Sequence, residues 1–176
     1  MRVFVVGTGR CGTVTFSKAC AHITNFSSGH ETYSRSFFEF KNLSIPDNRI
    51  EVDPHFAHVL PLALEKYPDA KWVHLIRARK PCVESIARTT GIKHYAKFAS
   101  MNESVKIEHV ADTFYSVVNA NIEMWLKKTN SMTMHLEKLS EEWPAFWDFI
   151  TAKGSIKDSI KEFETRYNNS KIKYGK

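Results

Sequence analysis

Cysteine is scarce in this sequence, and long apolar runs are absent. The 176 residues contain three cysteines, Cys11, Cys20 and Cys82, which are too few and too irregularly spaced for a disulfide framework or a zinc site. This scarcity favours a reducing compartment. No apolar run approaches the ~20 residues of a transmembrane helix, and no signal peptide precedes the first hydrophobic stretch. We therefore expect a cytoplasmic protein without a membrane span.

Glycine is also scarce, but it is concentrated at one place. Three of the seven glycines fall within residues 7–12, between a hydrophobic stretch at residues 3–6 and a helical pattern at residues 14–21. Backbone N–H groups approach an anion closely where side chains are missing, and the start of a helix adds partial positive charge. The stretch therefore predicts a loop that binds phosphate or sulfate. The alternative is an ordinary turn with a solvated Arg10.

The loop lacks the lysine of nucleotide-hydrolysing proteins. Gly7 and Gly12 match the pattern G-x-x-x-x-G-K-[ST], but Thr13 stands at the lysine position. Kinases and ATPases need that lysine on the phosphates and the next hydroxyl on magnesium. The only cation in the loop is Arg10, whose guanidinium suits a metal-free grip on phosphate or sulfate oxygens.

Size and charge limit the remaining possibilities. With 176 residues and 43% hydrophobic content, we expect a single domain over residues 1–176. The net charge of +6 favours anionic partners. The basic residues are scattered, and no aromatic-basic signature of an RNA-binding sheet is present, so we expect no nucleic-acid partner. The sequence does not indicate an oligomeric state.

Strand and helix patterns alternate along the chain, which predicts an α/β fold with a mainly parallel sheet. Residues 32–48 have no clear pattern, and we expect a helix or a loop over the edge of the sheet. Acceptor specificity is expected to lie in loops at residues 32–48 and 91–108. After the first strand and helix, the expected strands are 24–28, 49–52, 71–76 and 132–136, and the expected helices are 55–67, 81–89, 105–128, 143–150 and 156–167.

A second anion signal follows the strand at residues 71–76. Arg77 stands at the carboxyl end of this strand, where ligands of open α/β sheets bind, and Ser85 lies one to two turns into the next helix. The two side chains can converge on one phosphate. The alternative is a structural arginine at the end of a strand.

Together these motifs resemble the sulfotransferases that use 3′-phosphoadenosine 5′-phosphosulfate (PAPS). Residues 7–13 are similar to the family's 5′-phosphosulfate loop, and Arg77 with Ser85, preceded by residues 67–76, is similar to its 3′-phosphate motif. The departures are Ala78 and Arg79 in place of Asp-Pro. The family's basic glycine segment near the C-terminus is not evident, and residues 152–154 or 170–171 are candidates to replace it.

The resemblance implies a compact member of the family with a P-loop NTPase-like, three-layer αβα fold. It also implies PAPS as the donor, 3′,5′-adenosine bisphosphate (PAP) as the product, and no metal. Arg10 and the Thr13 hydroxyl are expected to stabilise the leaving phosphate, because sulfuryl transfer depends on positioning and on charge stabilisation. The residues expected to bind the donor are Gly9, Arg10, Cys11, Gly12, Thr13, Val14, Arg77 and Ser85.

The acceptor, a small molecule or carbohydrate with a hydroxyl or amine, needs a general base. Glu31 is the first candidate and His30 the second, since related carbohydrate sulfotransferases have a catalytic glutamate in this region. The alternatives are a charge at a helix start for Glu31 and a structural imidazole for His30. Two rival functions also remain: a P-loop nucleotide-dependent phosphotransferase and a non-catalytic nucleotide-binding domain.

Several other residues have a structural alternative that we favour. Glu51 and Asp53 are expected to form a salt bridge or to cap a helix. His55 and His58 have a spacing compatible with metal ligation, but no third ligand is evident, and a polar helix face is the better interpretation. An aromatic cluster, Phe37, Phe38 and Phe40, can line an acceptor pocket, although such residues more often belong to a core.

Overall fold

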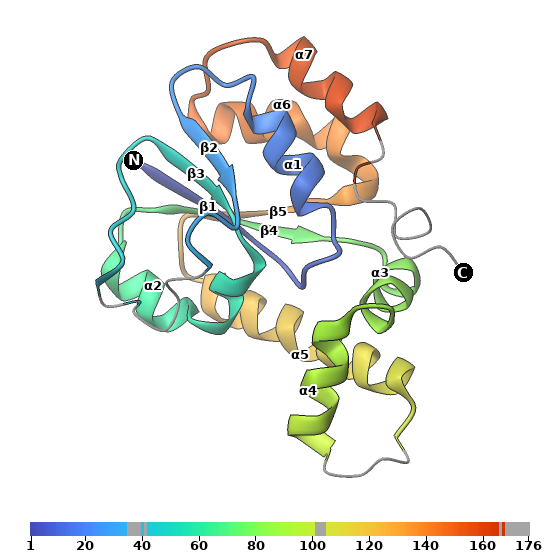
Figure 1. The fold of residues 1–176 in the computed structure, drawn as a ribbon. Coiled ribbons are helices and arrows are strands. Elements are labelled where there is room, and N and C mark those ends of the chain that lie inside the picture. Colours follow the sequence, from blue (N-terminus) through green and yellow to red (C-terminus); the bar gives the residue numbers. More distant parts are fainter. Residues whose placement is uncertain (35–39, 41, 101–104, 166, 168–176) are drawn as a thin grey trace.

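Five parallel strands form one sheet at the centre of the computed structural model, which describes residues 1–34, 40, 42–100, 105–165 and 167 (Figure 1). The strand order is β2-β3-β1-β4-β5, and every neighbouring pair is parallel. The strands are β1 (Arg2–Val6), β2 (Ser27–His30), β3 (Arg49–Val52), β4 (Lys71–Ile76) and β5 (Ser131–His135). The predicted α/β class with a parallel sheet is confirmed.

Helices cover both faces of the sheet and complete three layers (Figure 1). One face carries α1 (Thr13–Cys20), α6 (Leu139–Ile150) and α7 (Ile156–Lys161), and the other carries α2 (Leu60–Lys66) and α5 (Ile107–Leu126). Beside the first half of α5 lie α3 (Arg79–Ala87) and α4 (Thr90–Ser100). The short 3₁₀ helices are η2 (Pro54–His58), η3 (Leu136–Lys138) and η4 (Glu162–Glu164).

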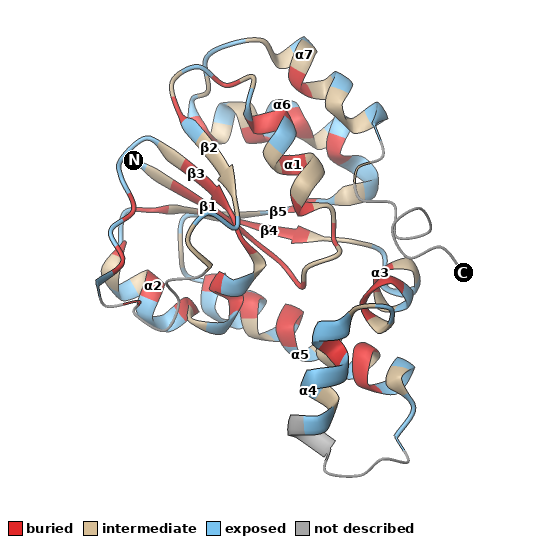
Figure 2. Cartoon of the chain, in the orientation of Figure 1, coloured by how far each residue is buried: buried red, intermediate tan, exposed pale blue. Residues whose placement is uncertain are grey.

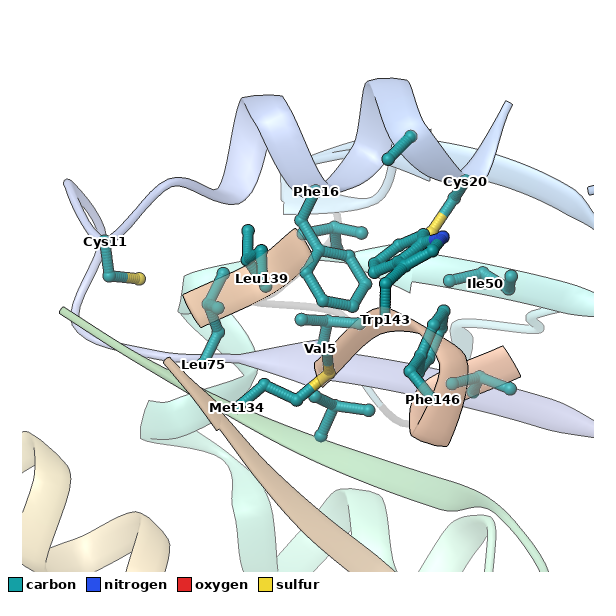
Figure 3. Close-up of a cluster of buried hydrophobic side chains, with 14 of the residues drawn as sticks. Val5, Cys11, Phe16, Cys20, Ile50, Leu75, Met134, Leu139, Trp143 and Phe146 are labelled. Carbon is teal, nitrogen blue, oxygen red and sulfur yellow. The ribbon is translucent and has the colours of Figure 1, made fainter. Parts of the chain in front are cut away.

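The sheet is buried on both faces, as expected for parallel strands covered by helices (Figure 2). Under α1, the rings of Phe16, Trp143 and Phe146 pack edge to face, with centroids 4.9 and 5.1 Å from Phe16 (Figure 3). On the opposite face, Phe4 stacks on Trp72 at 4.7 Å. These two clusters hold β1 in place, and β1 leads directly into the glycine-rich loop.

The expected loop at residues 91–108 is wrong over its first half, because residues 90–100 form α4. Ile92 is buried, and Tyr95 follows three residues later on the same face of the helix. This spacing is a helical signal that the nearby Thr90 and Gly91 obscure, since both residues have low helix propensity.

Other element boundaries shift in ways that have local causes. The second strand begins at Ser27 instead of residue 24, because Ile23 and Thr24 pair with residues 153–154. The expected helix at residues 55–67 divides into η2 and α2, and Pro61 lies in the first turn of α2. Across the described part of the chain, no helix has the length and apolar character needed to cross a bilayer.

Of the expected aromatic cluster, the structure describes only Phe40. Phe40 is buried and meets Phe56 edge to face, with ring centroids 6.1 Å apart, on the α2 side of the sheet. Phe40 is therefore a core residue. Phe37 and Phe38 lie outside the described residues.

Candidate functional site

The loop between β1 and α1 has a left-handed backbone at three positions. Gly9, Arg10 and Gly12 all have positive φ angles, of 72°, 57° and 96°. Turns of this kind are typical of a concave anion-binding nest of backbone N–H groups, which we expect here. Gly12 is the N-cap of α1 and provides no side-chain cap, so the first N–H groups of the helix remain available to a ligand.

Gly12 also lies close to the end of the sheet. A Cβ atom at this position would lie 2.3 Å from Cδ1 of Leu136, the residue that follows β5. A larger residue would therefore displace the Leu136 side chain, in addition to straining the left-handed backbone. The end of the sheet therefore helps to determine the loop's shape.

The two predicted anion motifs meet at Arg10. Its Nε donates to Oγ of Ser85 on α3 at 3.0 Å, and its carbonyl oxygen accepts a hydrogen bond from Nη1 of Arg77 at 3.0 Å. Residues that are about 70 positions apart in sequence are thus in direct contact. The carboxyl ends of β1 and β4 bring them together, because these two strands are neighbours in the sheet.

A cavity of about 640 Å³, which we call the loop cavity, opens over this contact. Its volume is within the range of ~300–1,000 Å³ that is typical of small-molecule sites. Six of the expected donor-binding residues line it: Arg10, Gly12, Thr13, Val14, Arg77 and Ser85. Gly9 and Cys11 are not among its lining residues.

Cys11 and Gly9 lie under or beside the loop instead. The Cys11 side chain is fully buried beneath the loop (Figure 3), and burial, with a smaller effect from Cys82, raises the pKa of its thiol to about 12. The thiol therefore stays protonated at neutral pH and is not activated as a nucleophile. A Cβ atom at Gly9 would lie 3.8 Å from Pro54, so η2 packs close to the loop.

The segment that carries Arg77 is anchored from two other elements. The hydroxyl of Tyr115 on α5 donates to the Arg77 carbonyl at 2.8 Å, and the Glu137 carboxylate accepts from the backbone N–H of Ala78 at 3.1 Å. Arg79 makes a bidentate ion pair with Asp112 on α5, at 2.8 and 2.7 Å. The departure from Asp-Pro at residues 78–79 therefore replaces a local turn with contacts to α5 and to the segment after β5.

Sequence reasoning missed some residues of the loop cavity. Arg88 lies three residues after Ser85, and helical spacing alone would have placed both on the same face. The segment after α7 gave no such signal, because its position depends on packing such as the edge-to-face contact of Phe163 with Trp143 at 4.9 Å. That segment contributes Phe163, Glu164, Thr165 and Tyr167 to the cavity wall.

The proposed replacement of the C-terminal glycine segment by residues 152–154 is wrong. Gly154 forms a bridge with Ile23, next to the C-terminal end of α1, whereas the loop is at the N-terminal end of this helix. A short α1 separates the two sites by about 12 Å, from a rise of ~1.5 Å per residue. Residues 170–171 lie outside the described part of the chain.

His30 and Glu31, the candidate bases, stand beside Thr13 at the end of β2. His30 Nε2 is 2.9 Å from the Thr13 hydroxyl oxygen and 3.7 Å from Oε1 of Glu31. Glu31 adopts a left-handed backbone with φ of 51°, an uncommon conformation for a residue other than glycine. Neither side chain lines the loop cavity.

The carboxylates at the end of β3 have the structural roles expected for them. Glu51 is fully buried and accepts hydrogen bonds from Arg49 at 2.7 Å and from the Thr32 N–H at 2.7 Å. Asp53 caps η2 by accepting from the His55 N–H at 2.8 Å. It also hydrogen-bonds the His55 ring at 2.7 Å, and this contact raises the pKa of His55. Among the described residues, no group of three or more His, Cys, Asp or Glu side chains is arranged to hold a metal ion.

Two solved structures that match this architecture are sulfotransferases. The sulfotransferase domain from the curacin biosynthetic pathway matches with a TM-score of 0.67 and 15% identity, over 93% of this chain and 77% of that one. The mouse sulfotransferase SULT7A1, complexed with PAP, matches with a TM-score of 0.57 and 13% identity, over 93% of this chain and 62% of that one. No family model and no curated protein sequence matches the chain. The chain therefore has the sulfotransferase fold that its motifs implied.

Proposed function

We propose that the chain is a sulfotransferase that moves a sulfuryl group from PAPS to a hydroxyl or amine of an acceptor. The observation that carries this proposal is the meeting of Arg10, Arg77 and Ser85 at one nest of backbone N–H groups. The sulfotransferase fold supports it, and one structure with this fold contains PAP. The absence of a lysine from the loop disfavours a phosphotransferase.

The lining of the loop cavity suits a ligand with two anionic groups. Three arginines face two acidic residues there, Glu84 and Glu164, so the cavity has an excess of positive charge. The nest at Gly12 fits one anionic end of the donor, and Arg77 with Ser85 fits the other. The cations are Arg10, Arg77 and Arg88.

PAPS supplies an activated sulfuryl group, and the protein stabilises the charge that develops on the leaving group. The acceptor oxygen or nitrogen forms a bond to sulfur while the bond from sulfur to the phosphate oxygen breaks. The phosphate leaves with the electron pair as PAP. Arg10 and the backbone N–H groups of Gly12 and Thr13 stabilise that phosphate. The acceptor proton passes to a base.

Glu31 is the base in this proposal, and His30 is the second candidate. The Glu31 carboxylate is 40% exposed, so an acceptor can reach it, and its left-handed backbone is the kind of strain that clusters at functional sites. His30 is already bonded to Thr13, which favours a role in holding that hydroxyl toward the donor.

Calorimetry with PAP tests the donor site. Loss of a charged hydrogen-bonding partner costs ~1.5–3 kcal/mol, so Arg77→Ala is expected to weaken PAP binding ~10–100-fold. Lys80→Ala is the matched control, because Lys80 is exposed, lies three residues away and does not line the loop cavity. Equal PAP affinity in both variants and the unaltered protein would overturn the proposal.

The same titration separates the rival functions. A preference for ATP with magnesium over PAP would indicate a phosphotransferase. PAP binding without transfer to any acceptor would indicate a nucleotide-binding domain that is not an enzyme.

A further inference from the structure

A second cavity, of about 300 Å³, adjoins the loop cavity and shares Arg10 with it. Its other walls come from the loop after β1, from η2, from the junction of α3 and α4, and from α5. Figure 1 shows α3, α4 and α5 gathered beside one another, on the side of the sheet away from α6 and α7. Arg10 thus stands between a cavity above the loop and a cavity against these three helices.

Aromatic and branched aliphatic side chains dominate this second cavity, which we call the aromatic cavity. Phe114 is at its centre, with the Tyr95 ring edge-on at 5.2 Å and the His58 ring tilted at 6.2 Å. Ile86 and Ile92 complete the wall and are 3% and 4% exposed. Such a surface favours a flat apolar ligand, because rings pack well against rings.

Few polar groups of the aromatic cavity are available to a ligand. The Thr8 hydroxyl donates to the Gly9 carbonyl at 2.9 Å, and the Thr89 hydroxyl donates to the Ile86 carbonyl at 2.8 Å. The other polar side chains of the lining are those of Arg10, His58 and Tyr95. A carbohydrate has hydroxyls around its whole ring and would leave most of them without partners here. A ligand with one hydroxyl group would not leave several polar groups without hydrogen-bond partners.

We propose that the aromatic cavity holds the acceptor, and that the acceptor is a small molecule with an apolar aromatic body and a hydroxyl group directed toward Arg10. The inference rests on the proposed function, because it takes the loop cavity as the donor site. Arg10 lines both cavities, so a hydroxyl at the inner end of the aromatic cavity is next to the donor's reacting end.

The ring of His58 in the aromatic cavity fits an acceptor hydroxyl. Burial, and the charge of His55 to a smaller degree, lower the pKa of His58, so its ring is neutral at neutral pH and can accept a hydrogen bond. His55 in turn interacts electrostatically with Glu31, the proposed base. Glu31, His55 and His58 therefore influence one another by charge, and His58 is the member of this set that lines the aromatic cavity.

Gly91 offers a position at the wall of the aromatic cavity for a larger side chain. It lines the cavity within α4 and is exposed, and a Cβ atom built on it meets no atom within 4 Å. We expect the indole of Gly91→Trp to reach over the cavity from this position, and Gly91→Ala is the matched control. Replacing glycine within a helix also favours folding.

The experiment measures binding of 2-naphthol, by its fluorescence, to the protein saturated with PAP. We expect 2-naphthol to bind and Gly91→Trp to weaken it at least about tenfold, since even one methylene changes binding in an apolar pocket by ~10-fold or more. Gly91→Ala should change naphthol affinity less than about twofold, because its methyl group fills little of the cavity. PAP affinity should be the same in all three proteins.

Two results would overturn the inference. One is equal naphthol affinity in Gly91→Trp and the unaltered protein, and the other is displacement of naphthol by N-acetylglucosamine at equal concentration. Phe114→Ala, with Val117→Ala on the exposed face of the same helix as its control, repeats the test from another wall. Failure of PAP to bind the unaltered protein would overturn the proposed function instead. In that case, the binding of naphthol without PAP would still test whether the aromatic cavity takes an aromatic ligand.

Discussion

The loop cavity and the aromatic cavity lie on either side of Arg10 and differ in almost every property. The first, of about 640 Å³, is lined by three arginines, by the start of α1 and by residues that follow β5 and α7. The second, of about 300 Å³, is formed by Phe114, Tyr95 and isoleucines. One suits an anion that must be neutralised, and the other suits an apolar body that leaves water.

In the function we propose, this difference separates two binding tasks. The fixed charges and the loop would recognise the donor, whereas shape and apolar area would recognise the acceptor. Arg10 lines both cavities, so the proposed reaction between the two ligands would take place beside it. Substitutions that act on one cavity should therefore leave the other unchanged, and three predictions test this independence.

The largest effect is expected on turnover, for a substitution that alters neither cavity. Glu31→Gln removes the proposed base, whose contribution to the rate is typically ~10²–10⁴-fold, and should lower turnover by that factor. Affinity for PAP and for 2-naphthol should be unchanged, because Glu31 lines neither cavity. Rate assays at saturating donor and acceptor measure this, with Glu65→Gln on the exposed surface of α2 as the control.

His30→Ala should be tested in the same rate assay. A loss of turnover in His30→Ala but not in Glu31→Gln would move the role of base to His30. Unchanged turnover in both variants would exclude both residues as the base.

A smaller effect is expected for Gly12→Ala, which should damage only the loop cavity. The added Cβ atom would collide with the Leu136 side chain. The alanine would also have to adopt a left-handed backbone conformation, which costs ~1–3 kcal/mol for residues other than glycine. PAP affinity should fall ~10–100-fold by calorimetry. Gly91→Ala is the matched control, and it should leave PAP affinity unchanged. Full PAP affinity in Gly12→Ala would mean that the loop does not contact the donor.

The smallest effect is expected for Ser85→Ala, which removes the acceptor of the Arg10 Nε hydrogen bond. One such bond contributes ~0.5–1.5 kcal/mol, so PAP affinity should fall ~3–10-fold without a change in naphthol binding. Ser116→Ala is a fitting control, because that hydroxyl pairs with Arg79 instead. A loss of naphthol affinity in Ser85→Ala would show that the two cavities are coupled through Arg10.

Local sequence signals were enough to predict the strand, loop and helix around Gly12, because glycine positions and hydrophobic stretches report on nearby backbone. They also placed Arg77 at the end of β4 and Ser85 on α3, since strand ends and helical spacing are short-range features. The contact between Arg77 and the Arg10 carbonyl was not predicted, because it depends on the lateral order of the strands.

Local sequence signals did not predict the aromatic cavity. It needs Phe114 on α5, Tyr95 on α4 and His58 on η2, which only the tertiary packing brings together. His58 was interpreted as part of a polar helix face, because a single imidazole carries no spacing signal. Residues 163–165 and 167 were not predicted to line the loop cavity for the same reason, since their position is set by contacts such as that of Phe163 with Trp143.

The close approach of Leu136 to Gly12 has a consequence for the order of folding. Leu136 follows the last strand, so the first loop of the chain is braced by a residue that emerges late from the ribosome. Contacts between segments so distant in sequence form slowly, because a long loop must close first. A nascent chain that ends before β5 therefore lacks the brace for its first loop. The finished shape of this loop would then report that the whole sheet has assembled.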